Sequence, residues 1–95
     1  MGGPRKTANV VRRPADWMEP VDDRILEAIR EHGNLTPRAI EHFDVTTRDH
    51  ASRRCKVLAK YGLLDRMVHG LYAITDEGLA YLEEDLDASE LEPSE

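Results

Sequence analysis

The chain has 95 residues, a formal net charge of −6, a single cysteine and an aromatic content of 5%. This length supports one domain with a modest core built mainly from aliphatic side chains, and one cysteine excludes an internal disulfide. The chain has no apolar run near the roughly 20 residues of a membrane span and no signal-peptide core, so we expect a soluble, cytoplasmic protein without a membrane partner.

Charge is distributed unevenly along the chain. Residues 1–15 carry four cations and no acid, residues 46–60 have a net charge of +4, and residues 76–95 contain nine acids and no base. A charge distribution this polarised allows an anionic partner to bind locally despite the negative total. Arginine outnumbers lysine ten to three, which together with the excess of acid is similar to proteins adapted to a salt-rich cytoplasm.

Residues 1–15 show neither a helical nor a strand period and contain glycine, proline and cations. We interpret them as a flexible basic arm, disordered in the free protein, that can contact DNA on binding. Trp17 follows this arm. It is expected to be a packing anchor or a dimer contact, because no second aromatic residue neighbours it in the sequence.

The first helix is predicted at about residues 21–32. Pro20 fits its first turn, the acids at 22 and 23 suit the positive end of the helix dipole, and Gly33 is placed to end it. Its apolar stripe consists of Val21, Ile25, Leu26 and Ile29.

A second helix is predicted at about residues 37–43, with Thr36 as its cap and a proline at its first position. Three of its side chains are expected to face the core: Ala39, Ile40 and Phe43. Asp44 and Val45 then turn the chain into a third helix, at about residues 47–61. Two helices joined by so tight a turn, the second of them cationic, form a helix-turn-helix.

The third helix has a narrow apolar stripe of Ala51, Cys55 and Leu58 at i, i+4 and i+7, opposite a mainly cationic face. Thr46 or Thr47 can cap its start. Cys55 is interpreted as a small core residue, with a redox-sensing thiol as the alternative.

Two short strands are predicted next, at residues 64–68 and 71–74, separated by a tight turn at His69 and Gly70. Thr75 caps a last helix at about residues 76–86, and residues 87–95 are expected to be a disordered acidic tail. The order α-α-α-β-β-α is that of a winged helix-turn-helix, a mainly α fold with a small β-hairpin (α+β). We assign it to residues 16–86 as a DNA-binding domain, with the hairpin as the wing.

Base reading requires side chains on the first two turns of the recognition helix, since only that end reaches the groove floor. Those that meet this condition are Arg48, Asp49, Ser52 and Arg53. Contact with the DNA backbone is expected from Thr46, Thr47, His50, Arg54, Lys56 and Lys60. The wing would add Arg66, His69 and Gly70. Asp49 as a helix cap and His50 as a partly packed residue remain open alternatives.

With these elements in place, the chain resembles the winged-helix proteins of halophilic archaea related to the repressor of the phage phi-H. The matching segments are ADWMEPVDDRILEAIREHGNLTP at 15–37, ASRRCKVLAKYGLLDR at 51–66 and GLYAITDEGLAYL at 70–82. The resemblance implies a small, sequence-specific, double-stranded DNA-binding transcriptional regulator, a repressor, usually homodimeric. The chain departs from the family pattern at the wing, where His69 and Ala73 stand in place of the common arginines.

Other functions fit less well. Ser52 has no obvious base partner and the chain has no glycine-rich phosphate loop, so we do not expect an enzyme. We also expect no cofactor, no metal site and no small-molecule ligand. A winged helix used only for protein contact is the main alternative, because this fold hosts both uses. Neither that use nor a merely solvated helix face would require the cations of residues 48–60.

Overall fold

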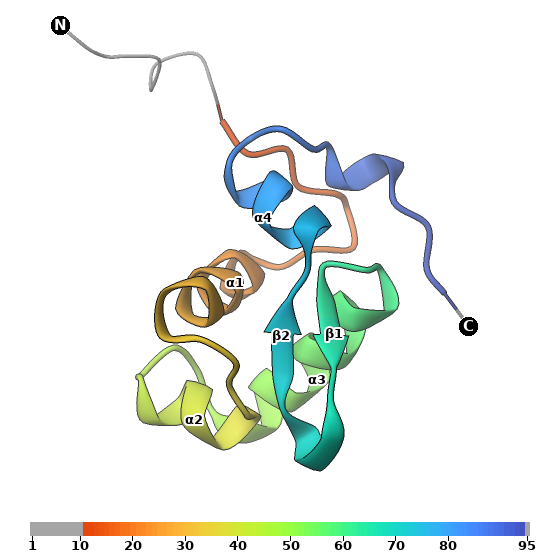
Figure 1. Ribbon diagram of the computed structural model, residues 1–95. Helices are drawn as coiled ribbons and strands as arrows, with labels where there is room; N and C mark the ends of the chain where they lie inside the picture. The colour runs from red at the N-terminus through yellow and green to blue at the C-terminus, as the bar shows by residue number, and fades with distance from the viewer. Residues whose placement is uncertain (1–10, 95) are drawn as a thin grey trace, which may run out of the picture.

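The structure is a computed structural model and describes residues 11–94. In chain order its elements are α1 (Pro20–His32), α2 (Pro37–His42), α3 (Arg48–Lys60), β1 (Leu64–Arg66), β2 (Tyr72–Ile74) and α4 (Asp76–Leu82), with single 3-10 turns at Val68–Gly70 and Ala88–Glu90. The predicted winged helix-turn-helix is confirmed (Figure 1). Within residues 11–94, no helix has both the length and the apolar character needed to cross a membrane.

Threonine hydroxyls begin three of the four helices. Each accepts a hydrogen bond from a backbone N–H inside the first turn, and the capping residues are Thr36, Thr47 and Thr75. The start of α1 instead has a reciprocal capping box, in which Glu19 and Asp22 each bind the other's backbone N–H. The first turn of α1 is therefore held in part by the carboxylate of Asp22, which lies within that turn.

The core lies where α1, α3 and the hairpin meet. The predicted stripes are confirmed: Ile25, Leu26 and Ile29 of α1 are buried, with Val21 half-buried against the core. Ala51, Cys55 and Leu58 of α3 are buried as well. The hairpin and α4 add large buried side chains: Leu63, Leu64, Tyr72 and Tyr81. Figure 1 shows the hairpin running in front of α3, with α1 beside it and α4 above.

The wing is a short antiparallel hairpin in which Leu64 pairs with Ile74 and Arg66 with Tyr72. Leu35 adds a bridge on the other side of β2: its N–H donates to Tyr72 O at 3.0 Å and its carbonyl accepts from Tyr72 N at 2.8 Å. The wing is thereby tied to the loop between α1 and α2.

The strands are shorter than predicted because the turn is longer. Met67 N donates to Leu71 O at 2.7 Å, and this bond closes a loop containing the 3-10 turn. Inside it, His69 (φ 62°) and Gly70 (φ 72°) both adopt left-handed backbone conformations. The expected two-residue turn is thus replaced by a broader tip.

Two helix predictions need correction. The last helix ends at Leu82 and not at residue 86, because Glu84 turns left-handed (φ 69°) and Asp85 N bonds back to Ala80 O at 2.8 Å. Phe43 does not face the core: it is 42% exposed and stacks on the ring of His32, with centroids 3.9 Å apart. This pair joins the C-terminal ends of α1 and α2 at the surface.

The terminal segments are more ordered than expected over the residues that the structure describes. Arg13 and Asp87 form a parallel bridge, Ala88 N donates to Arg13 O at 2.9 Å, and the Ala88 side chain is completely buried. Arg12 is paired with carboxylates of α1 and donates to Leu82 O. Residues 11–15 are therefore not part of a flexible arm, and the chain from 87 to 94 is not a free tail. The rest of the predicted arm, residues 1–10, lies outside the described residues.

The base of the hairpin packs closely on the start of α4. Thr75 Oγ1 donates to Gly62 O at 2.6 Å, and Thr75 N donates to Leu63 O at 3.2 Å. Gly78 faces the same carbonyl, and a Cβ there would overlap Leu63 O and lie 2.7 Å from Ile74 Cγ1. Only glycine fits at this contact.

Candidate nucleic-acid interface

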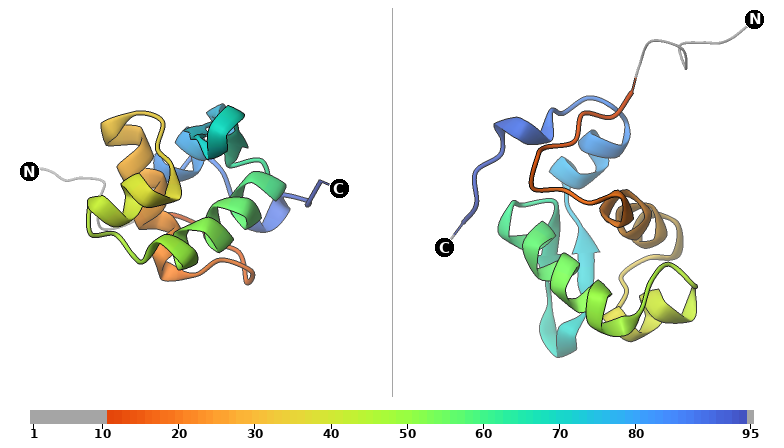
Figure 2. Two further views of the ribbon diagram at one scale, coloured as in Figure 1. Left: turned by 90° about the horizontal axis from the view of Figure 1, so that it is seen from below. Right: turned by 180° about the vertical axis from the view of Figure 1, so that it is seen from behind.

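The outer side of α3 carries the exposed cations of this helix. Arg48, Arg53, Lys56 and Lys60 are exposed, and Ser52 is half-buried among them. Figure 2 shows this helix from behind, lying across the front of that view with its outer side toward the viewer. These five predicted contact residues therefore share one accessible surface.

The first turn of α3 is held by α2 and by its own cap. Thr47 Oγ1 accepts from His50 N at 3.3 Å, and Glu41 Oε2 accepts from Arg48 N at 3.1 Å. Arg48 Nε lies 3.6 Å from Asp49 Oδ1, with both side chains more than half exposed. Such a surface pair contributes little to stability, so either partner is free to exchange it for another contact. Asp49 does not cap the helix; the cap is Thr47.

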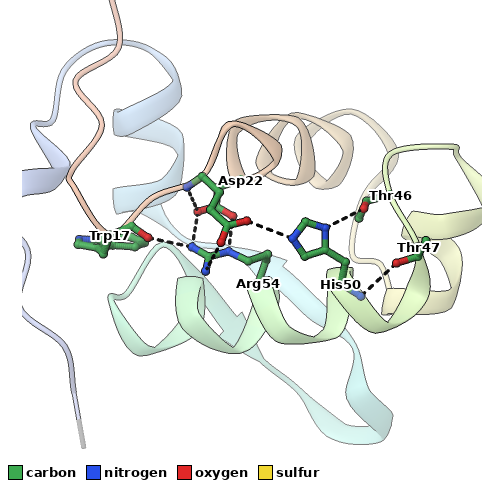
Figure 3. Close-up of polar contacts among 7 residues, drawn as sticks. Trp17, Asp22, Thr46, Thr47, His50 and Arg54 are labelled. Carbon is green, nitrogen blue, oxygen red and sulfur yellow. Dashed lines mark hydrogen bonds and ion pairs between the residues drawn. The ribbon is translucent and has the colours of Figure 1, made fainter.

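His50 is partly packed, as its alternative interpretation predicted. Its Nδ1 lies 3.0 Å from Thr46 Oγ1 and its Nε2 lies 3.1 Å from Glu19 Oε1 (Figure 3). Thr46 and His50 thus satisfy each other inside the protein. Neither side chain is available to DNA without breaking these contacts.

Arg54 lies inside the molecule, contrary to its predicted place among the backbone contacts. Its Nε and Nη2 donate to the two oxygens of Asp22 at 2.9 and 2.8 Å, and Nη2 also donates to Trp17 O at 3.0 Å (Figure 3). Glu19 adds a third carboxylate contact at 3.3 Å, and the Arg54 side chain is only 11% exposed. The hydrogen bonds that Arg54 donates to Asp22 raise the pKa of Arg54 above its ordinary value. We therefore correct the prediction that Arg54 contacts phosphate.

Asp22 is the partner of Arg54 that the sequence did not lead us to expect. It is the one buried charged residue of the described chain, at 0% exposure. A signal was present: Asp22 lies at i, with Leu26 at i+4 and Ile29 at i+7, so that it continues the apolar stripe of α1. An acid in an apolar stripe requires a buried cation, and Arg54 next to buried Cys55 supplies one.

The wing presents a mixed surface. Arg66 and His69 are exposed as predicted, and Gly70 is half-buried. Between the two exposed residues, Met67 and Val68 are 46% and 76% exposed. The tip is therefore more apolar than the sequence analysis anticipated.

Cys55 is a core residue, as predicted. The thiol is completely buried among apolar side chains, and burial raises its pKa to about 12. Because the thiolate is the reactive form, this environment opposes the redox-sensing alternative.

Comparison with known proteins gives the same family by three routes. Residues 11–94 match the family described as winged helix-turn-helix phage repressor. The repressor protein of Halobacterium phage phiH is 34% identical over 87 residues, which cover 86% of this chain and 98% of that one. The crystal structure of a PhiH1 repressor-like protein from Haloarcula marismortui is similar with a TM-score of 0.83 and 41% identity, over 90% of this chain and 99% of that one. The chain belongs to the winged helix-turn-helix phage repressor family.

Proposed function

We propose that this protein is a repressor that binds duplex DNA sequence-specifically, with the N-terminal half of α3 in the major groove. The family is a non-enzymatic class of DNA-binding proteins. The observation that carries the proposal is the sorting of cations on α3. Arg48, Arg53, Lys56 and Lys60 are exposed on its outer side, while Arg54 is neutralised inside the molecule.

Within this interface, Arg48 and Arg53 are the base readers, because an arginine can donate two hydrogen bonds to guanine O6 and N7. Ser52 lies between them, and Asp49 can accept from a cytosine amino group once its pair with Arg48 opens. Lys56 and Lys60 lie further along the helix and contact phosphates. Thr47, exposed at the start of α3, adds a backbone contact. Thr46 and His50, which contact each other, take no part until DNA displaces them.

The wing meets the DNA backbone or minor groove beside α3. Arg66 supplies a cation, and His69 lies at the tip next to Gly70. Because the neighbouring Met67 and Val68 are apolar, wing contacts contribute less to the salt dependence of binding than the α3 lysines do.

Selection of bound fragments from random duplex DNA tests the proposal. The expected result is a preferred sequence whose affinity falls with salt at a slope of about 0.9 per contacted phosphate on a log-log plot. A winged helix used only for protein contact would bind no duplex at low salt. That result would contradict the proposal and favour the protein-contact function.

We further propose that the protein binds DNA as a two-fold symmetric homodimer, since a core of this size gains from association. Each subunit would present one recognition helix to a half-site, with centres about 34 Å apart or a multiple of that distance. Light scattering of the free protein and of its DNA complex at micromolar concentration measures this. A monomer in both samples would rule the dimer out.

A further inference from the structure

Two consecutive arginines of α3 have opposite environments. Arg53 is exposed on the outer side, whereas Arg54 is buried against the N-terminal end of α1. Successive residues of a helix are separated by about 100° around its axis. The direction in which Arg54 is held therefore determines the direction in which Arg53 points.

All three guanidinium nitrogens of Arg54 are engaged at once. Its Nε and Nη2 form the paired bonds to Asp22, Nη2 also binds the carbonyl of Trp17, and Nη1 lies 3.3 Å from Glu19 Oε2. A planar guanidinium bound on two edges has one orientation, unlike a lysine ammonium, which can rotate on its stem. The contacts thus fix the side chain in the plane of its acceptors.

The acceptors are fixed as well. Asp22 Oδ2 also accepts from Glu19 N at 3.0 Å, which is one half of the capping box of α1. Asp22 is fully buried, so its carboxylate has no room for a second position. Trp17 contributes a backbone carbonyl and not a mobile side chain. The anchor of Arg54 is therefore part of the rigid start of α1.

A buried ion pair of this kind adds little net stability compared with an apolar pair, but its hydrogen bonds have a fixed direction. Replacing a buried pair by apolar residues of similar volume is often neutral for stability, whereas removing one partner is costly. Apolar side chains fill the space without specifying an angle. Orientation is the property that the Asp22–Arg54 pair has and an apolar pair lacks.

We propose that Arg54 is a positioning residue for sequence readout: bound to Asp22 and Trp17, it sets the rotation of α3 against α1 and thereby the aim of Arg53 and Ser52 at the bases. This inference rests on the proposed DNA-binding function and deepens it. Arg54 itself contacts no DNA. Asp22, on a different helix and without access to solvent, acts in the same chain of contacts.

The test compares five variants on two probes, a duplex selected from a random pool and a random-sequence duplex of the same length. Arg54→Lys and Asp22→Asn break the paired geometry, and Asp22→Leu with Arg54→Met replaces the pair by apolar side chains. Arg30→Met, at an exposed position in the last turn of α1, is the matched control. Lys60→Met reports what losing a phosphate contact does. Thermal unfolding followed by circular dichroism is measured for all five.

Each disrupted pair is expected to lower the ratio of selected to random affinity about tenfold, the discrimination of one good base contact. The salt slope stays at the wild-type value in the Asp22/Arg54 double variant, whereas Lys60→Met lowers it by about 0.9. The double variant regains thermal stability but not the affinity ratio. This result would distinguish a role of the pair in orienting α3 from a role in stability alone.

Recovery of the affinity ratio together with stability in the double variant would overturn the inference, as would a fall of about 0.9 in its salt slope. Wild-type protein that binds duplexes with no preferred sequence would overturn both this inference and the sequence specificity of the proposed function, while leaving DNA binding itself intact. Wild-type protein that binds no duplex would instead reject the proposed function. If the single variants do not fold, the double variant still decides between orientation and stability.

Discussion

The indole of Trp17 stacks face to face on the phenol ring of Tyr61, with centroids 3.8 Å apart and planes inclined by 8°. Trp17 precedes α1 and Tyr61 caps the C-terminal end of α3. The carbonyl of the same tryptophan accepts from Arg54. One residue outside the helices thus binds α3 at two places, through its ring and through its backbone.

Loss of this stack is expected to destabilise the protein. Trp17→Ala should lower the free energy of unfolding by about 2 kcal/mol, because a half-buried aromatic pair is removed. Trp17→Phe, which keeps a ring against Tyr61, should lose less than half of that. Urea unfolding followed by circular dichroism measures both variants. Equal losses for the two would mean that ring stacking makes no contribution of its own.

The exposed cations of α3 should separate into two classes on mutation. Arg53→Ala should cost roughly 1 to 3 kcal/mol on a preferred duplex and little on random DNA, since it removes a base contact. Lys60→Ala should weaken both duplexes alike, because phosphates carry no sequence information. Fluorescence anisotropy titrations on the two duplexes distinguish the classes. An equal loss on both for the Arg53 variant would remove it from the base readers.

Stability should fall in alkaline solution, and Cys55 is one cause. Burial raises the pKa of its thiol from 9.0 to about 12, so between these values the unfolded state releases a proton that the folded state keeps. This contribution is fully present below pH 9 and is lost as pH rises, by about 1 kcal/mol between pH 9 and pH 10. Cys55→Ala should flatten that part of the curve. Chemical denaturation at three pH values tests it, and parallel curves for the variant and wild type would contradict it.

Removal of the C-terminal segment should destabilise the fold. Deleting residues 87–95 removes the buried Ala88 side chain and its hydrogen bond to Arg13 O. We therefore expect the free energy of unfolding to fall by about 2 kcal/mol. Thermal unfolding measures the effect. Deleting only residues 92–95 is the control, since it keeps Ala88 and the half-buried Leu91. An unchanged melting temperature for the longer deletion would show that this contact is not stabilising.

The electrostatic role of the segment is better tested by substitution than by deletion. Its end lies against α3, because Ser94 N donates to Lys60 O at 2.7 Å, and Glu90 and Glu92 are exposed nearby in sequence. Replacing both acids by glutamine should raise the affinity for random duplex at low salt. Near 1 M salt the screening length is about 3 Å and the difference should vanish. Superimposable low-salt titrations would mean that these charges do not act on DNA.

Local patterns were sufficient to predict the elements of the fold. The stripes of α1 and α3, the threonine caps and the glycines after α1 and α3 depend on neighbours three or four positions away. The ends of elements were predicted less well. Leu86 continues the spacing of the last helix, yet the left-handed Glu84 ends that helix earlier, and no glycine marks the place. A residue that adopts this conformation without being glycine leaves little trace in the sequence.

Of the candidate DNA interface, only the exposed side of α3 could be predicted from the sequence. Exposed Arg53, Lys56 and Lys60 follow from the helical period, because the side opposite a buried stripe faces solvent. The place of Arg54 does not follow, since its partner Asp22 is 32 residues away. A cation beside the buried stripe can turn either way, and only the tertiary contact decides. The Trp17–Tyr61 stack joins still more distant positions and was missed for the same reason.

The absent side chain at Gly78 has a mechanical consequence for the wing. The first turn of α4 lies directly against Leu63, and Thr75 is bonded to the two residues that precede β1. The end of α3, the base of the hairpin and α4 therefore form one stiff block with no hinge at the root of the wing. The tip beyond Arg66 lies outside these contacts. The distance between Val68 or His69 and a bound duplex would then depend on the orientation of this whole block relative to the DNA.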